Sequence, residues 1–384
     1  MSWYVPFDKL GVKQVEVLNG ITKQLEQPHW VQGFAGTGKT LVVTHLMERV
    51  AQLKPSASIC FITFTHALKD LVKSGLHGNV AKRVKIKTHT QFISDRTRYD
   101  YVFLDEVQDI RPTDLTKIRA LADNLYIAGD TDQRIYTEGA NEDDVVMQLQ
   151  PTKWKLLEIF RLTKLLQRLA QSILPRTMLV EGVHAKKHSE VTISLAKHSS
   201  SIDESRWVWR EASRRARAGE PSAILFPTHK AIARFAREVA ESLDLDEVPR
   251  RQGRDYEAFN AFWNSAGLNL MYFGNSQGDL TLSDNRPFVY LMTFHSSKGL
   301  DFRNVFIPGM RANAVIVHPD ALIDDPELDQ RLLFVAVTRS RENLFISYNG
   351  DRPHPLLANL PKDVIAEISP KKPGDDQNEQ EEFF

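Results

Sequence analysis

The chain has 384 residues, 42% of them hydrophobic and 26% charged, and a formal net charge of zero. These values are ordinary for a globular protein of two or three domains, and no apolar run reaches the length of a membrane-spanning helix. The single cysteine, Cys60, excludes an intramolecular disulfide bond, and the N-terminal segment lacks the basic and apolar regions of a secretion signal. We therefore expect a cytoplasmic protein without a membrane partner.

The first predicted element with a chemical signature is GFAGTGKT, residues 33–40. It follows HWVQ, which has the pattern of a short buried strand, and precedes LVVTHLMERVAQL, whose apolar residues recur at helical spacing. A Gly-x-x-x-x-Gly-Lys-Thr sequence in this context is typical of a P-loop, in which backbone N–H groups surround phosphates. Lys39 would add a positive charge and Thr40 a hydroxyl ligand for Mg²⁺. A glycine-rich turn that matches by chance is the alternative.

Further strand-like segments punctuate the chain and end in polar residues. In the first third they are HWVQGF, ASICFITF, YVFLDE and LYIAGD, and after Pro151 they are PSAILFPTH, PFVYLMTFH, NVFIPGM and NLFISY. Strands that alternate with helices predict parallel sheets with ligands at their carboxyl edges. We predict an α/β fold with two domains, residues 1–150 and 151–360, a small insertion near 244–280, and an acidic disordered tail over 361–384.

The segment YVFLDEVQD places two acids, Asp105 and Glu106, at the end of an apolar strand. In nucleotide hydrolases one such carboxylate holds Mg²⁺ and the other positions the attacking water. We assign Asp105 to the metal and Glu106 to the role of catalytic base. The alternative for these acids, and for Asp109 in particular, is a helix N-terminus, where negative charge is favourable.

Eight segments then form a series in chain order. They are LGVKQ, GFAGTGKT, ITFTHALKDLV, LDEVQD, GDTDQRIY, EIFRLTKLLQRLA, LMTFHSSKGLDFRNVFIPGM and RLLFVAVTRSRENLFIS. The series resembles the Q motif and motifs I, Ia, II, III, IV, V and VI of superfamily 1 helicases of the UvrD/Rep type, and it covers most of the chain. The resemblance implies two tandem RecA-like domains that hold ATP between them and use its hydrolysis to move along single-stranded DNA, in the 3′→5′ direction.

The resemblance also assigns roles within the ATP site. Arg161 and Arg339 match the arginine fingers of the family and Gln133 matches its γ-phosphate sensor, so these residues and Glu106 are the predicted catalytic set. The residues predicted to contact ATP are Gln14, Gly33, Ala35, Gly36, Thr37, Gly38, Lys39, Thr40, Gly299 and Asp301. Asp301, expected at the ribose, stands where the family usually has Glu. A solvated charge on a helix face is the alternative for Arg161.

The residues implied to contact the DNA strand are Phe64, Thr65, Thr88, His89, Tyr136 and His295. Phe64 and Tyr136 would stack on bases, and the others would lie near phosphates or along the path between the domains. A core phenylalanine is the alternative for Phe64, and a buried, hydrogen-bonded histidine is the alternative for His295.

Two features depart from the family. Its motif III usually continues with a tryptophan that stacks on a base, but here Thr137 and Glu138 follow Tyr136. Trp263 and Phe273 are candidates to replace it, although core packing is the stronger expectation for both. The gaps after motif Ia and before motif V are too short for the two accessory domains of full-length relatives. We therefore expect ATPase and translocation, with unwinding that is weak or depends on a partner.

The last residues, QNEQEEFF (377–384), are acidic and end in two aromatics. A solvating tail is the plain interpretation. The spacing also resembles a sliding-clamp peptide, with Gln380 in the usual aliphatic position, and the composition resembles the tail of bacterial single-strand-binding proteins. Either partner would tether the chain to the replication machinery.

Two functional alternatives remain open from the sequence. One is a nucleotide-gated DNA-binding switch or sensor that works with a partner in repair or phage defence and does not travel. The other is an RNA substrate, because recognition of the 2′-OH leaves no motif in the chain.

Overall fold

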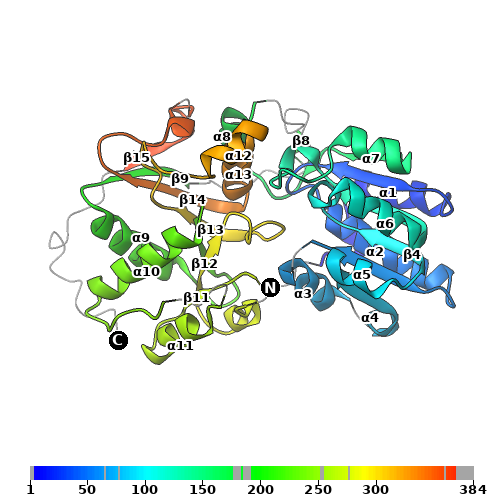
Figure 1. Cartoon of the computed structure of the whole chain (residues 1–384), viewed down its shortest axis with the longest axis horizontal. Helices are drawn as coiled ribbons and strands as arrows, with labels where there is room; N and C mark the ends of the chain where they lie inside the picture. Colours follow the sequence, from blue (N-terminus) through cyan, green and yellow to red (C-terminus); the bar gives the residue numbers. More distant parts are fainter. Residues whose placement is uncertain are drawn as a thin grey trace.

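The computed structural model describes residues 4–64, 66–76, 78–175, 183–184, 192–250, 255–275, 277–358 and 360–368. The chain forms two lobes that lie side by side, each built around a parallel sheet (Figure 1). This is the predicted α/β fold of two tandem RecA-like domains.

The first lobe contains a six-stranded sheet in the order β3-β2-β4-β5-β1-β6. Its strands are β1 (His29–Gly33), β2 (Ile59–Thr63), β3 (Val84–Thr88), β4 (Tyr99–Leu104), β5 (Ala122–Gly129) and β6 (Thr152–Leu156). Its α-helices are α1 (Val12–Thr22), α2 (Lys39–Leu53), α3 (His66–Gly75), α4 (Gly78–Arg83), α5 (His89–Asp95), α6 (Pro112–Ala120) and α7 (Glu142–Leu149), and its 3₁₀ turns are η1 (Phe7–Lys9), η2 (Val107–Asp109) and η3 (Thr131–Gln133). All strand pairs are parallel, so the loops after β1, β2, β4 and β5 meet at one edge.

Strand β6 differs from the sequence prediction, which began the second domain at Pro151. It pairs in parallel with β1, Thr152 opposite His29 and Leu156 opposite Gly33, so it is the outer strand of the first sheet. Most of its side chains are exposed, as in an edge strand, and Leu156 alone is buried. The lobe boundary therefore falls after Leu156.

The second lobe contains a seven-stranded parallel sheet in the order β11-β12-β10-β13-β14-β9-β15. Its strands are β9 (Thr192–His198), β10 (Ser222–Phe226), β11 (Leu270–Tyr272), β12 (Val289–Thr293), β13 (Phe302–Ile307), β14 (Ser340–Asn349) and β15 (Ala366–Ile368). Its helices are α8 (Lys164–Ile173), α9 (Ser201–Arg215), α10 (His229–Ser242), α11 (Glu257–Ser265), α12 (Pro319–Asp324) and α13 (Leu328–Val337), with the 3₁₀ turns η5 (Leu280–Asp284) and η6 (Pro355–Leu357). A short pair, β7 (Glu158–Ile159) and β8 (Val183–His184), lies apart from both sheets.

The segment near 244–280, expected as an insertion, is instead part of the second sheet. Strand β11 pairs with β12, and α11 buries Phe259 and Trp263 against the same core. These aromatics and Tyr256 recur at helical spacing, which is the signal of a packed helix.

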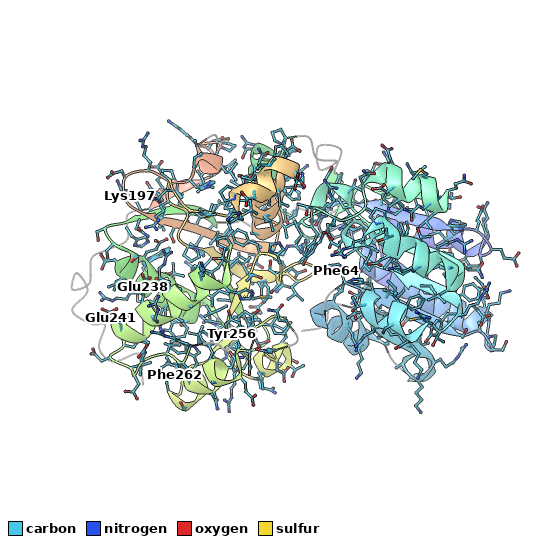
Figure 2. The ribbon with its side chains drawn as sticks, viewed as in Figure 1. Phe64, Lys197, Glu238, Glu241, Tyr256 and Phe262 are labelled. Atoms are coloured by element: carbon cyan, nitrogen blue, oxygen red, sulfur yellow. The ribbon has the colours of Figure 1, made fainter. Side chains whose placement is uncertain are left out.

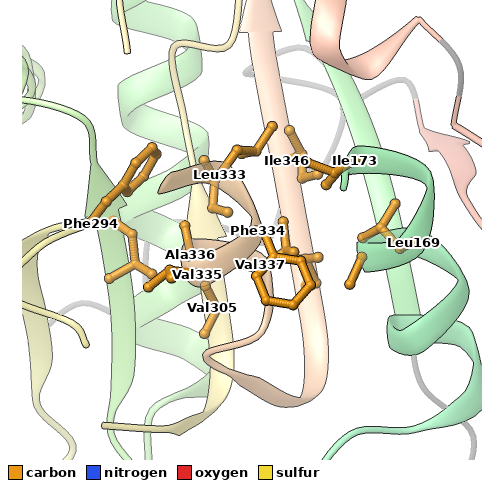
Figure 3. Packing of buried hydrophobic residues seen from close by; sticks show 14 of the residues in the cluster. Leu169, Ile173, Phe294, Val305, Leu333, Phe334, Val335, Ala336, Val337 and Ile346 are labelled. Atoms are coloured by element: carbon orange, nitrogen blue, oxygen red, sulfur yellow. The ribbon is translucent and has the colours of Figure 1, made fainter. Parts of the chain in front are cut away.

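Helix α13 is apolar nearly all round because it lies between α8 and the sheet (Figure 3). The core that encloses it also includes Phe34, Ala35 and Ile135 from the first lobe. The two lobes are therefore in apolar contact, through Phe34 and Ala35 just after β1 and through Ile135 in motif III.

Within the part of the chain that the structure describes, every helix is too short or too polar to cross a bilayer. The disordered tail was predicted to begin at residue 361, but β15 pairs with β9 at the edge of the second sheet, so the ordered fold continues at least to Ile368. The remainder of the tail, including QNEQEEFF, lies outside the described residues, and the expectations placed on it are untested.

Candidate functional site

The P-loop joins the end of β1 to the start of α2. Gly36 and Gly38 both have a φ of 83°, a left-handed conformation that favours glycine. A Cβ on Gly36 would lie 2.7 Å from the Cβ of Arg161, and one on Gly38 would lie 2.4 Å from Nε2 of Gln14. Glycine is therefore required at both positions by backbone conformation and by close neighbours. The residues expected to contact phosphates lie in this turn and at the ends of the two elements that it joins: Gly33, Ala35, Gly36, Thr37, Gly38, Lys39 and Thr40.

Gln14, from α1, is buried beside the P-loop. Its Nε2 donates to the carbonyl oxygen of Thr37 at 2.9 Å, and its Oε1 accepts from the N–H of Gly11 at 2.9 Å. The side chain thus fixes the P-loop against the start of α1. Contact with an adenine remains a prediction.

Lys39 is buried at the first position of α2. Its Nζ donates to the carbonyl oxygens of Gly33 at 2.8 Å and Phe34 at 3.0 Å. Burial lowers the pKa of Lys39, whereas nearby carboxylates, Asp130 foremost, favour its charged form. A cation enclosed by inward-turned backbone is the arrangement that P-loops present to phosphates.

Asp105 follows β4 and is fully buried. Its Oδ2 accepts from the hydroxyl of Thr40 at 2.5 Å. Burial, followed by the charge of Glu106, raises the pKa of Asp105 to about 7. A hydroxyl and a carboxylate oxygen in contact are hard donors of the kind that Mg²⁺ prefers, so Thr40 and Asp105 fit the predicted metal site.

Glu106 has a left-handed backbone (φ 56°, ψ 48°), which is uncommon outside glycine. Its Oε2 accepts from Nε2 of Gln108 at 2.5 Å. Burial alone would raise the pKa of Glu106, but Lys298 and Lys39 outweigh it and hold this pKa below its usual value. The carboxylate is therefore ionised, as a base must be.

Asp109 does not begin a helix; it is buried at the end of η2 and pairs with a lysine of the other lobe. Nζ of Lys298 donates to Asp109 Oδ1 at 2.8 Å and to the carbonyl oxygen of Gln133 at 2.6 Å, and it lies 3.8 Å from Glu106 Oε2. Lys298 is one of two residues of this site that the sequence did not single out. Its motif V position, between Ser297 and Gly299, was the available signal.

Arg161, after β7, lies against the P-loop through Gly36. Its Nη1 donates to Asp301 Oδ2 at 3.3 Å, and the other oxygen of Asp301 lies 3.4 Å from Nε of Arg341. Nε of Arg161 is buried and, among the residues described, has no hydrogen-bond partner. The guanidinium is thus held inside the cleft with donor capacity left over, so a solvated helix-face charge does not describe it.

Arg339, after α13, is fully buried. It donates to the carbonyl oxygens of Val335 at 2.9 Å and Leu300 at 3.1 Å. Burial, followed by the charge of Arg161, lowers the pKa of Arg339 to about 9, while Glu106 acts in the opposite direction. Arg339 therefore lies close enough to Arg161 and Glu106 for their charges to change its pKa.

Gly299 brings the lobes together near this site. Its φ is 83°, and a Cβ on it would lie 3.6 Å from Leu68 of α3. Gln133, on the first lobe, donates from Nε2 to Asp130 Oδ2 at 2.6 Å. Because the charge of Asp130 acts on Lys39, this pair links the end of β5 to the P-loop.

A row of four rings crosses from one lobe to the other. Phe64 stacks on His89 with centroids 4.9 Å apart and contacts Tyr136 at 4.7 Å, and Tyr136 contacts His295 of the second lobe at 5.4 Å. Figure 2 shows Phe64 on the side of the first lobe that faces the second. All four side chains are partly exposed, so the structure brings the predicted stacking residues together at the seam.

The two histidines of this row are neutral. Burial lowers the pKa of His89, and burial together with Lys298 and His229 lowers the pKa of His295 to about 4. Neither ring can offer a positive charge to a phosphate at neutral pH, although both retain a ring face.

The remaining predicted strand contacts differ among themselves. Thr88 is buried and caps α5 by accepting from the N–H of Gln91 at 3.4 Å, so its hydroxyl is engaged in the fold. Thr65 lies outside the described residues. Trp263 and Phe273 are buried in the core, as the plainer expectation had it.

Phe160 is a second residue that the sequence reasoning passed over. Its N–H donates to the carbonyl oxygen of Gly36 at 2.9 Å, and its ring lies where a side chain on Gly11 would be. The ring is partly exposed beside the P-loop, which makes it a candidate to stack on a base. The signal was its place next to Arg161 in motif IV.

Comparison with known proteins adds independent evidence. The UvrD-like helicase C-terminal domain matches residues 251–351, and an AAA domain matches residues 19–138. The ATP-dependent DNA helicase PcrA of Staphylococcus epidermidis is 32% identical over 139 residues, 32% of this chain and 18% of that protein. The R568 protein of Acanthamoeba polyphaga mimivirus is 24% identical over 296 residues, 71% of this chain and 38% of that protein.

A solved structure of the Arterivirus nonstructural protein 10 helicase with DNA has 15% identity and a TM-score of 0.46, over 89% of this chain and 65% of that one. The chain spans less than a fifth of the length of the PcrA helicase that it matches. The two domain matches lie one in each lobe, so the chain is similar to UvrD-like helicases in its second lobe and to an AAA domain in its first.

Proposed function

We propose that the chain is an ATP-driven translocase or helicase on single-stranded DNA, moving in the 3′→5′ direction. The observation that carries the proposal is the meeting of charged groups from both lobes at the P-loop. Lys39 belongs to the first lobe, and Arg161 and Arg339 lie beyond the lobe boundary. In addition to burial, the charge of Arg161 lowers the pKa of Lys39 and also that of Arg339, so the three cations lie near one another. An ATP bound at the P-loop would therefore face cations on its far side.

Each residue has a distinct role in this proposal. Lys39 and the P-loop N–H groups bind the β- and γ-phosphates, and Glu106 accepts a proton from the attacking water. Arg161 and Arg339 stabilise the charge that develops on the γ-oxygens. Mg²⁺, held by Thr40 and Asp105, would neutralise phosphate charge when bound.

The link from hydrolysis to movement is the set of contacts between lobes. Lys298 joins Glu106 and Asp109 to the second lobe, and the same seam carries the rings of Phe64, Tyr136 and His295. Loss of the γ-phosphate would weaken the attraction across the cleft, and a small rotation would move His295 relative to Phe64. Bases stacked on these rings would then be released and regripped.

We further propose that unwinding by this chain alone is weak or partner-dependent. Among the described residues, the elements between β2 and β3 are α3 and α4, and those between β10 and β12 are α10, α11, β11 and η5. None of these is a large accessory domain that could engage a duplex. We also propose that the tail at 377–384 binds a sliding clamp or a single-strand-binding protein. Deleting these residues should abolish co-purification with that partner. If the deleted chain still captures the partner, the tail serves only to solvate the chain.

The test is the steady-state ATPase rate as a function of oligonucleotide length, with DNA and with RNA. Translocation predicts a rate that rises with strand length and then reaches a plateau, and a Lys39→Ala variant serves as the blank. A rate independent of length would favour the switch or sensor. Equal stimulation by RNA would overturn the assignment of DNA.

A further inference from the structure

A second set of charges joins the lobes away from the P-loop. Asp325, after α12, is buried between two arginines, one from each lobe. Its Oδ2 accepts from Nη2 of Arg134, in the first lobe, at 3.3 Å and also from Nη2 of Arg331 in α13. Arg331 in turn donates from Nε to the carbonyl oxygen of Arg134 at 2.7 Å. These three residues are the interlobe triad.

The triad connects two parts of the proposed ATP site, the segment that carries Gln133 and the helix that precedes Arg339. Arg134 directly follows Gln133, the proposed γ-phosphate sensor. Arg331 lies in the helix that ends just before Arg339, the proposed finger. At 1.5 Å per residue, the six steps from Arg331 to the end of the helix at Val337 span about 9 Å, and Arg339 follows two residues later.

The backbone carbonyl groups of two consecutive residues in the first lobe, Gln133 and Arg134, each accept a hydrogen bond from a buried cationic side chain of the second lobe. Lys298 donates to the carbonyl of Gln133 at 2.6 Å, and Arg331 donates to that of Arg134 at 2.7 Å. Any shift of the Gln133–Arg134 segment must therefore displace the motif V turn, α13 or both.

The triad also borders free space. A cavity of about 400 Å³ is lined by both its arginines and by Asp132, Glu142, Leu174 and Glu327, among others from the two lobes. The cavity gives the Arg134 and Arg331 side chains space beside the packed core that holds the rest of α13. A buried ion pair is in general weak evidence for stability, and its best attested use is to fix one arrangement among several.

We propose that Arg134, Asp325 and Arg331 are positioning residues that set the orientation of α13, so that the nucleotide state read at Gln133 controls the placement of Arg339. This inference rests on the proposed ATPase function and concerns the coupling within it. Among the described residues, the side chains of the triad pair with one another, with the carbonyl oxygens of Arg134 and Gly139, and with Glu327.

The test compares Asp325→Asn and Arg134→Gln, singly and together, with Asp324→Asn as the matched control on the exposed side of α12. ATPase kcat and KM for ATP are measured with saturating single-stranded DNA, alongside the melting temperature. We expect the triad variants to lower kcat by roughly ten- to a hundredfold, because small misplacements of catalytic groups have effects of this size. KM for ATP should stay within about twofold, since the P-loop contacts are intact.

Three further readouts separate positioning from mere folding. The double variant should lose no more than the single ones, because the residues act as one unit. Asp325→Glu, which keeps the carboxylate, should recover most of the rate, and Asp324→Asn should match the wild type. If Asp325→Asn does not fold, Arg134→Gln, whose side chain is partly exposed, carries the test.

Two results would overturn the inference. A folded Arg134→Gln or Asp325→Asn protein with wild-type kcat would remove it and leave the proposed ATPase standing. Additive losses in the double variant, with KM and the melting temperature changing in parallel, would reduce the triad to a structural contact. A wild-type chain that does not hydrolyse ATP would remove the proposed function first, and this inference with it.

Discussion

Lys298 Nζ lies 2.7 Å from Oδ2 of Asp109, and this contact joins the second lobe to the acidic segment of the first. Both side chains are almost completely buried. A buried pair of this kind holds the lobes in one arrangement, and movement between them must break or rotate it. The pair also fixes the cation that keeps Glu106 ionised.

Replacing Lys298 by methionine should shift the acidic limb of the kcat–pH profile to higher pH. Lys298 is the strongest of the groups that lower the pKa of Glu106, so without it this pKa rises and the base is protonated at pH values where the wild type is active. The measurement is kcat between pH 5.5 and 9. Lys230→Met, on the exposed face of α10, is the control, and an acidic limb in the same place for both variants would contradict the account.

The Asp105→Asn variant should be more heat-stable than the wild type at pH 8 in a chelating buffer, although it should hydrolyse no ATP. The pKa of Asp105 rises from 3.8 to about 7 on folding, so the stability that its protonated form contributes is present below pH 4 and lost as the pH passes 7. Each kcal/mol recovered should raise the melting temperature by roughly 2–4 °C. The gain should vanish near pH 4.

The matched control for this prediction is Asp8→Asn, an exposed carboxylate of the first lobe. Its melting temperature should follow that of the wild type at both pH values. A lower melting temperature for Asp105→Asn at pH 8 would show that the carboxylate is held by favourable contacts instead of being penalised by burial.

Arg339→Ala should lower kcat by about 10³ while nucleotide binding stays close to normal, because a finger acts mainly on the transition state. Binding can be followed with a fluorescent ADP analogue. Arg303→Ala, a half-exposed arginine of β13, serves as the control. Turnover at the wild-type rate would refute the finger role.

Phe64→Ala should weaken single-stranded DNA binding by about 1–3 kcal/mol, or roughly 5- to 150-fold in Kd, because a stacking surface is lost. The melting temperature should change little, since the ring is partly exposed at the seam (Figure 2). Phe262→Ala, a partly exposed ring of α11, is the comparison. A large drop in melting temperature with unchanged affinity would make Phe64 a core residue.

The sequence was most informative where chemistry fixes the local pattern. The glycines at 36 and 38, Lys39, and the acids after β4 were predicted at their places because a phosphate site requires those residues in that order. Strand β6 was placed in the wrong domain because its pairing with β1 leaves no local pattern in the sequence, and β9 was not predicted because charged segments flank it.

Contacts between the lobes could not be predicted from local sequence patterns. Lys298 meets Asp109 across 189 positions and Arg134 meets Asp325 across 191, and neither pair has a spacing that sequence periodicity can detect. Such pairs depend on how the two sheets are placed, and this follows from packing over the whole interface around Phe34, Ile135 and α13.

The central claim is that ATP draws the two lobes together and that its hydrolysis lets them part. Spin labels on cysteines introduced at Lys85 and Lys230, exposed residues of the first and second lobes, would report the distance between them. Cys60 should not react, because burial raises the pKa of its thiol to about 12. The account predicts different distance distributions for the nucleotide-free, ATP-analogue and ADP states on single-stranded DNA, and one unchanging distribution in Lys39→Ala. The same distribution in every state of a chain that hydrolyses ATP would contradict it.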